Sequence, residues 1–176
     1  AHLHDGTNPG TIFVWRLRDL PQFINNSGTR SNFTIAGTGV TSLKPACLTT
    51  GFQRAFYGDV DVDGTVFDDR VYWSAIRDGN LIDDPTNDFE SVETYAKDKV
   101  RMVRGLSDLI LIGKKNNILS LIPTPEQTES FTLQEEPGGL YKGPVSQQGS
   151  VVVDQEVFWI GQNNIHSYDQ NHRIRD

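Results

Sequence analysis

Short apolar runs, each followed by turn-forming residues and a second apolar run, recur along the chain. Nearly the same pattern occurs in Asp108–Leu121 (DLILIGKKNNILSL) and in Gln155–Tyr168 (QEVFWIGQNNIHSY). In each segment a β-branched or aromatic run meets a glycine and two asparagines, which favour a turn, before the second run begins. The pattern predicts two β-hairpins, which pair Leu109–Ile112 with Ile118–Leu121 and Val157–Ile160 with Ile165–Tyr168.

A looser third copy of the pattern precedes these two. The apolar run Val71–Ile76 is followed by Asp78-Gly79-Asn80 and by Leu81-Ile82, and Asp-Gly is a strong hairpin signal. The copies are spaced by 38 and 48 residues, counted from Val71, Leu109 and Val157. This spacing is near the ~40–45 residues of a propeller blade.

The repeated pattern therefore predicts an all-β fold of antiparallel hairpins with a partial or complete β-propeller-like architecture. A β-sandwich is the alternative, because any two hairpins of a sandwich also look alike. The core of the repeats is expected to contain Val71, Trp73, Ile110, Ile112, Phe158 and Trp159.

Further strands are expected between the hairpins, at Lys99–Leu106, Glu129–Glu136 and Gly149–Asp154. The run Val151–Val153 has no apolar-polar alternation, which is typical of a strand covered on both faces. The best helix candidate is Asn87–Lys99.

Two regions are predicted: an N-terminal strand and loop segment of unknown affiliation, 1–53, and a region of propeller-like repeated hairpins, 54–176. Since the chain stops directly after a hairpin, we expect that a partner supplies further blades or that the chain is a piece of a longer protein.

Composition excludes several classes of function. With 176 residues, 36% of them hydrophobic, the chain can form one domain with a real core. The net charge of −7 argues against a protein that wraps nucleic acid by neutralising phosphates. Between Arg54 and Asp98, twelve acidic residues stand against four basic ones, so one face is expected to be strongly anionic. A single cysteine, Cys47, gives no internal disulfide, and no apolar run is long enough for a membrane span, so no membrane partner is expected.

The segment DVDVDG is the sharpest candidate for a metal site. Alternate aspartates followed by glycine are how calcium loops direct carboxylates at one ion, and Asp59, Asp61 and Asp63 would be the ligands. The remainder of a calcium loop is missing, because Phe67 and Arg70 stand where its later acidic ligands belong. The favoured interpretation is an acidic hairpin with its turn at Asp63-Gly64 and its aspartates pointing outward. Calcium is the one cofactor that the sequence leaves open.

The sequence contains no strong candidate for a catalytic or phosphate-binding site. No nucleophile-elbow pattern is present, and we expect no enzymatic activity. The basic residues that follow the acidic stretch could meet phosphates, but pairing with the acidic stretch is favoured for Lys97, Lys99, Arg101 and Arg104.

Three segments together carry a family resemblance: DRVYWSAIRDGNLIDDPTNDF at Asp69–Phe89, VRMVRGLSDLILIGKKNNILSL at Val100–Leu121, and GPVSQQGSVVVDQEVFWIGQNNIHSYD at Gly143–Asp169. Their order resembles the β-propeller region of tail hub, or nozzle, proteins of short-tailed bacteriophages, including the packaged-DNA stabilisation and tubular-tail type. The similarity extends over Arg54–Asp176, although family members are usually far longer.

The resemblance implies a structural role in the virion tail. A homo-oligomeric ring below the portal would form a conduit that retains packaged DNA and then passes it, with portal, adaptor and other tail proteins as partners, transient contact with DNA, and assembly in the host cytoplasm. An anionic wall would repel phosphates, so the candidates for facing the channel are Asp59, Asp61, Asp63, Asp68 and Asp69. Two alternatives stay open: a calcium-dependent β-propeller binding module and a tail-associated carbohydrate-active domain.

Overall fold

The computed structural model describes residues 43–76, 88–94, 97–124, 131–169 and 171–176 with their side chains, and the backbone alone of five short strands outside these ranges. The predicted all-β fold is confirmed, because 61% of the residues described with their side chains are in strands and 3% are in helix. The one short helix described is a 3-10 turn, η1 (Gln147–Gly149).

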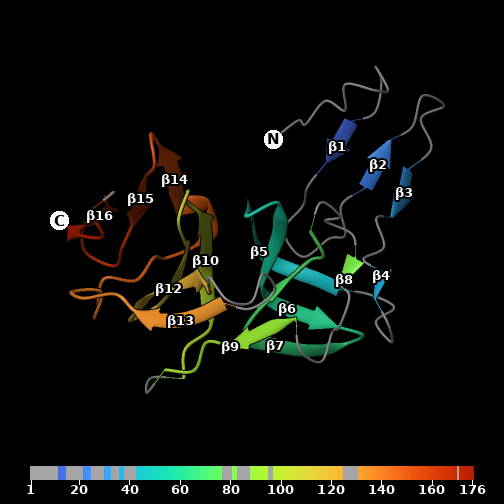
Figure 1. The fold of residues 1–176 in the computed structure, drawn as a ribbon, viewed down its shortest axis with the longest axis horizontal. Coiled ribbons are helices and arrows are strands. Elements are labelled where there is room, and N and C mark those ends of the chain that lie inside the picture. Colours follow the sequence, from blue (N-terminus) through green and yellow to red (C-terminus); the bar gives the residue numbers. More distant parts are fainter. Residues whose placement is uncertain are drawn as a thin grey trace.

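Three four-stranded antiparallel sheets make up the body of the protein (Figure 1). The first sheet contains β5 (Leu43–Gly51), β6 (Arg54–Val62), β7 (Thr65–Trp73) and β9 (Phe89–Ser91). The second contains β10 (Val100–Gly105), β11 (Ile110–Lys114), β12 (Ile118–Pro123) and β13 (Phe131–Glu135). The third contains β14 (Ser150–Val153), β15 (Glu156–Ile160), β16 (Ile165–Tyr168) and β17 (Ile174–Arg175). In each sheet the strands lie side by side in chain order.

Two smaller groups of strands lie outside this body. A three-stranded sheet contains β1 (Ile12–Val14), β2 (Gln22–Ile24) and β3 (Arg30–Asn32). A parallel pair is formed by β4 (Ala36–Gly37) and β8 (Leu81–Ile82).

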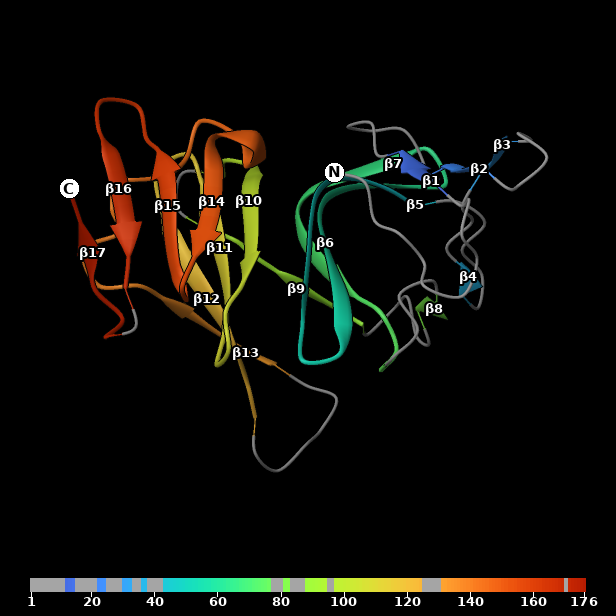
Figure 2. The ribbon, with the colours of Figure 1, turned by 90° about the horizontal axis from the view of Figure 1, so that it is seen from above.

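The three large sheets stack face to face, with the second in the middle (Figure 2). One apolar cluster lies between the first and second sheets and another between the second and third. The alternation of side chains along a strand explains the pattern, because neighbouring residues point to opposite faces. Leu111, for example, packs toward the third sheet, whereas Ile110 and Ile112 pack toward the first. The described sheets form an open stack of three, which extends beyond the two sheets of a sandwich.

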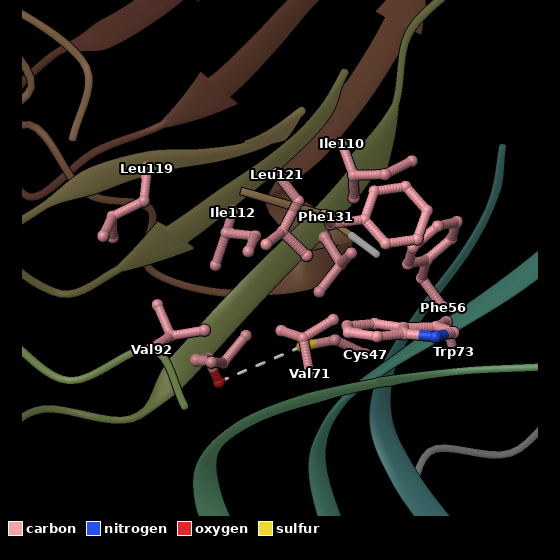
Figure 3. Close-up of a cluster of buried hydrophobic side chains, with 12 residues drawn as sticks. Cys47, Phe56, Val71, Trp73, Val92, Ile110, Ile112, Leu119, Leu121 and Phe131 are labelled. Atoms are coloured by element: carbon pink, nitrogen blue, oxygen red, sulfur yellow. Dashed lines mark hydrogen bonds between the residues drawn. The ribbon is translucent and has the colours of Figure 1, made fainter. Parts of the chain in front are cut away.

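Aromatic side chains organise the cluster between the first two sheets (Figure 3). The Phe131 ring of β13 lies 5.0 Å from the Trp73 ring and 5.2 Å from the Phe56 ring, measured between centroids. Cys47 is buried beside them, and its thiol donates to the Val100 carbonyl at 4.0 Å. Strands that are distant in sequence are thus held together by a dense apolar contact.

The two hairpins predicted from the repeated pattern at Asp108–Leu121 and Gln155–Tyr168 are confirmed. The third hairpin, predicted to pair Val71–Ile76 with Leu81-Ile82, is wrong. β11 pairs with β12, and β15 pairs with β16, as second and third strands of their sheets. β7, which contains Val71 and Trp73, pairs with β6 and β9 instead of with β8. The expected turn at 78–80 lies outside the described residues. The hairpin that corresponds to the other two copies is therefore β6–β7, whose turn is Asp63-Gly64.

Two further expectations are corrected. Part of the helix candidate Asn87–Lys99 is strand β9, because Phe89 stacks on Tyr72 at 5.0 Å and its backbone extends the first sheet. The division at 53 and 54 falls inside the turn between β5 and β6, which pair over their whole length. The repeated-sheet region thus includes residues from Leu43 onward.

Most of the predicted core residues are buried, and one is not. Exposed fractions of 0% to 4% are found for Val71, Trp73, Ile110, Ile112 and Trp159. Phe158 is only half-buried, because the alternation along β15 directs it to the opposite face from Val157 and Trp159. It lies on the side of the third sheet that no other sheet in the described residues covers.

Candidate functional site

The acidic hairpin β6–β7 is the first candidate surface. Its two-residue turn has positive φ at both positions, 50° at Asp63 and 88° at Gly64, as in the type I′ turns that suit hairpin twist. The Asp61 carboxylate accepts a hydrogen bond from the Gly64 amide at 2.8 Å. The predicted turn is confirmed, and one of the three candidate metal ligands is used to stabilise it.

Asp59 does not point outward, contrary to the prediction. Its side chain is 3% exposed and pairs with the Lys99 ammonium at 2.9 Å. An irregularity in the ladder between β6 and β7 causes the change, because Asp59 adopts a φ of 49° and breaks the alternation of its strand. The favoured pairing of Lys99 with the acidic stretch is therefore confirmed, and Asp59 is an internal partner that links the first two sheets.

The predicted calcium ligands are not gathered around a common point. Asp59 is engaged with Lys99, Asp61 is engaged with its own turn, and Asp63 is exposed at the tip. In the part of the chain that the structure describes, no group of three or more acidic, histidine or cysteine side chains lies close enough to hold a metal ion.

Asp68 and Asp69 lie near a buried cation that the sequence analysis missed. Lys114 of β11 is 0% exposed, and its ammonium donates to the Val92 carbonyl at 2.5 Å. Burial lowers the pKa of Lys114, and this effect is opposed by the nearby carboxylates of Asp98, Asp69, Asp68 and Glu93. Part of the acidic stretch therefore serves as counter-charge to an internal lysine. The sequence pattern of β11 does not indicate that Lys114 is buried, because a lysine at the end of a strand is usually solvated.

A polar junction joins β5, β10 and η1. The Gln147 side chain donates to the carbonyls of Leu48 and Val103 at 3.1 and 3.0 Å, and accepts from the Val103 amide at 2.7 Å. The Arg104 guanidinium donates to both the carbonyl and the hydroxyl of Ser150. These contacts connect one strand of each large sheet to the next, and no local sequence pattern indicates them.

β5 and β10 also approach closely at a glycine. A Cβ atom at Gly105 would lie 2.1 Å from the Thr50 carbonyl oxygen, so no larger residue fits there. The Gly105 amide donates to the Thr49 hydroxyl at 2.9 Å. The polar junction and this close approach together fix the second sheet against the first.

The third sheet presents an exposed apolar surface, which we name the outer face. It consists of Val151, Val153, Phe158, Ile160 and Ile165. Directly opposed residues of neighbouring strands share a face, and Val151 opposes Phe158 while Ile160 opposes Ile165. The exposed fractions are 53% for Val151 and 65% for Ile165. This surface is therefore a contiguous apolar patch on the side of the stack that no other described sheet covers.

The inner face of the third sheet is anchored at Trp159. Its indole Nε1 donates to the Lys142 carbonyl at 2.6 Å, and its ring lies 5.7 Å from the His166 ring. His166 contacts the Asp176 carboxylate at 2.8 Å, and the Lys142 ammonium does so at 2.6 Å. Lys142 and His166 lower the pKa of the Asp176 carboxyl. The last residue of the chain is thereby held against the sheet.

Comparison with known proteins adds no assignment to this geometry. No protein-family model matches the sequence, and no curated protein is significantly similar to it. Among the described residues, no helix has both the length and the apolar character to span a membrane.

Proposed function

We propose that the chain is a non-enzymatic structural subunit in the tail of a short-tailed bacteriophage, in the hub or nozzle ring below the portal. The observation that carries the proposal is the stack of three four-stranded antiparallel sheets tied together by apolar cores and a polar junction. Such a stack makes a stiff body with sheet faces available for assembly. The resemblance of Arg54–Asp176 to the propeller region of tail hub proteins supports the location in the virion.

In this role the ring forms a conduit that retains packaged DNA and then lets it pass. A wall that bound phosphates would hold the genome back, whereas an anionic wall repels it at short range. The exposed aspartates of the hairpin β6–β7, Asp63 at its tip and Asp68 on β7, form the surface that best fits the wall. Asp59 no longer belongs to this surface, because it is buried against Lys99. Assembly takes place in the host cytoplasm, and contact with DNA is transient.

The mass of the assembly in solution tests the proposed role. Native mass spectrometry or light scattering is expected to show a closed ring of more than two 19.7 kDa copies, formed alone or on addition of a purified portal complex. A protein that forms no ring and does not bind portal at any concentration contradicts the proposed role.

Reversing the charge at the hairpin β6–β7 tests whether this hairpin faces the conduit. In the assembled ring, Asp63→Lys is expected to raise affinity for double-stranded DNA about threefold at low salt, with a steeper salt dependence, because phosphate contacts release counterions. Fluorescence anisotropy over a salt series measures both quantities. Asp154→Lys is the matched control, since Asp154 is also an exposed turn aspartate, with a φ of 48°. If the control gains as much affinity as Asp63→Lys, the hairpin does not face the conduit.

A further inference from the structure

We propose that two copies of this chain pack through the outer face of the third sheet, related by a twofold axis. The pairing goes beyond the proposed ring, because a twofold contact on one face leaves the remaining surfaces free for other contacts.

The composition of the outer face is that of an interface. Its centre is apolar, with Val153 and Ile160 49% and 51% exposed. Its margin is polar, since Glu156 opposes Val153 and Arg175 opposes Ser167. An apolar centre with a polar rim is the usual anatomy of a protein–protein contact, and contiguous exposed apolar patches mark such contacts.

The pattern of covered faces points to another sheet as the occupant. Both faces of the second sheet are buried against its neighbours, and the inner face of the third sheet is buried in the same way. The outer face would continue this series of sheet-on-sheet interfaces. Val151 and Val153 agree with this, because both lie on the outer face and are 53% and 49% exposed, in a run whose lack of alternation predicts a strand covered on both faces. The mismatch between sequence pattern and exposure at these two valines disappears when a second sheet packs on the outer face.

A second copy can supply that sheet only with its own outer face. The opposite end of the stack is the far side of the first sheet, and its apolar residues are already buried, with exposed fractions of 0% for Leu43 and Val60 and 2% for Tyr72. Head-to-tail stacking of large sheets is therefore excluded, and the same face must meet itself. The rim favours this arrangement, because Glu156 and Arg175 give it both signs of charge.

The area of the outer face determines how stable the dimer is expected to be. Four strands at ~4.8 Å spacing make a patch on the order of 15 Å wide, and strands of four or five residues at ~3.3 Å per residue make it about 15 Å long. Its area is thus on the order of 200 Å², smaller than the ~800 Å² per partner of a stable interface. The dimer should therefore be weak and depend on protein concentration. Sedimentation velocity over a series of concentrations measures the monomer–dimer equilibrium of the full chain.

Val151→Lys and Ile165→Lys are expected to raise the dissociation constant of the dimer at least about tenfold, because each places a charge in the apolar centre. Both positions are exposed, so the variants should fold, and circular dichroism checks this. The matched control is Val66→Lys, since Val66 is a strand valine of similar exposure, 59%, on the first sheet. It should leave the equilibrium unchanged.

A mixing experiment separates a twofold contact from other contacts. The Val151→Lys variant, labelled and mixed with unlabelled wild-type chain, should not form a mixed dimer of wild-type strength, because each copy contributes the same face. Three results would overturn the proposal: a protein monomeric at every concentration, a dimer equally weakened by Val66→Lys, or full-strength pairing of variant with wild type. A dimer without a ring would support the pairing and count against only the proposed tail role.

Discussion

Trp159→Ala is expected to lower the free energy of unfolding by about 3–5 kcal/mol, the cost of removing a large aromatic side chain from a core. Trp159 is 1% exposed and lies in the cluster between the second and third sheets. The substitution also leaves the Lys142 carbonyl without its indole donor. Urea unfolding followed by circular dichroism measures the change, with the slope of the transition as a check on compactness.

Two variants make this result specific. Trp159→Phe keeps an aromatic ring in the core but removes the hydrogen bond and part of the buried volume, so it should cost about 1–2 kcal/mol. Phe158→Ala changes the adjacent residue on the outer face and should cost less than Trp159→Ala in the monomer, because Phe158 is only half-buried. Equal losses for Phe158→Ala and Trp159→Ala would mean that the third sheet is not packed on the second as described.

Lys114→Ala is expected to cost about 3–5 kcal/mol, because it leaves a cavity and an unsatisfied buried carbonyl. The Lys114 ammonium donates to the Val92 carbonyl and has four carboxylates nearby. Lys114→Met fills most of the same volume without the charge. It should cost only about 1–2 kcal/mol, since the carboxylates are at least partly solvated and lose little when the lysine is replaced.

The neighbouring Lys115→Ala is the control for Lys114, because Lys115 is exposed. It should change the free energy of unfolding by less than about 0.5 kcal/mol. Thermal and urea unfolding of the three variants are compared at neutral pH. A loss for Lys114→Met as large as that for Lys114→Ala would show that charge, and not volume, dominates this site.

The sequence predicted local structure well where turn chemistry and alternation agreed. Asp63-Gly64 tolerates the positive φ values of a two-residue turn, and Gly161 with the two asparagines of its loop favours a turn, so the hairpins β6–β7 and β15–β16 could be predicted. The same kind of turn signal at Asp78-Gly79 led to a wrong prediction, a hairpin between Val71–Ile76 and Leu81-Ile82. Leu81-Ile82 contributes only the short strand β8, and β7 extends its sheet with β9 instead. A turn signal states that the chain bends, but not which strand pairs afterwards.

The candidate sites were harder to predict because they depend on contacts between sheets. Asp59 sits in an acidic run that looks solvated, and only the ladder irregularity and the distant Lys99 place it inside. Gln147 lies 99 residues from Leu48, whose carbonyl it bonds, so no local pattern can reveal the junction. Phe158 illustrates the same limit for the core, because alternation separates two faces without showing which face a neighbouring sheet covers.

The reactivity of Cys47 can report how often the first and second sheets separate. It is the single cysteine of the sequence, and its thiol is buried where the first and second sheets meet. A thiol reagent can reach it only when those sheets move apart, so the rate of modification counts such openings. Since no other thiol competes for the reagent, the reading requires no engineered label.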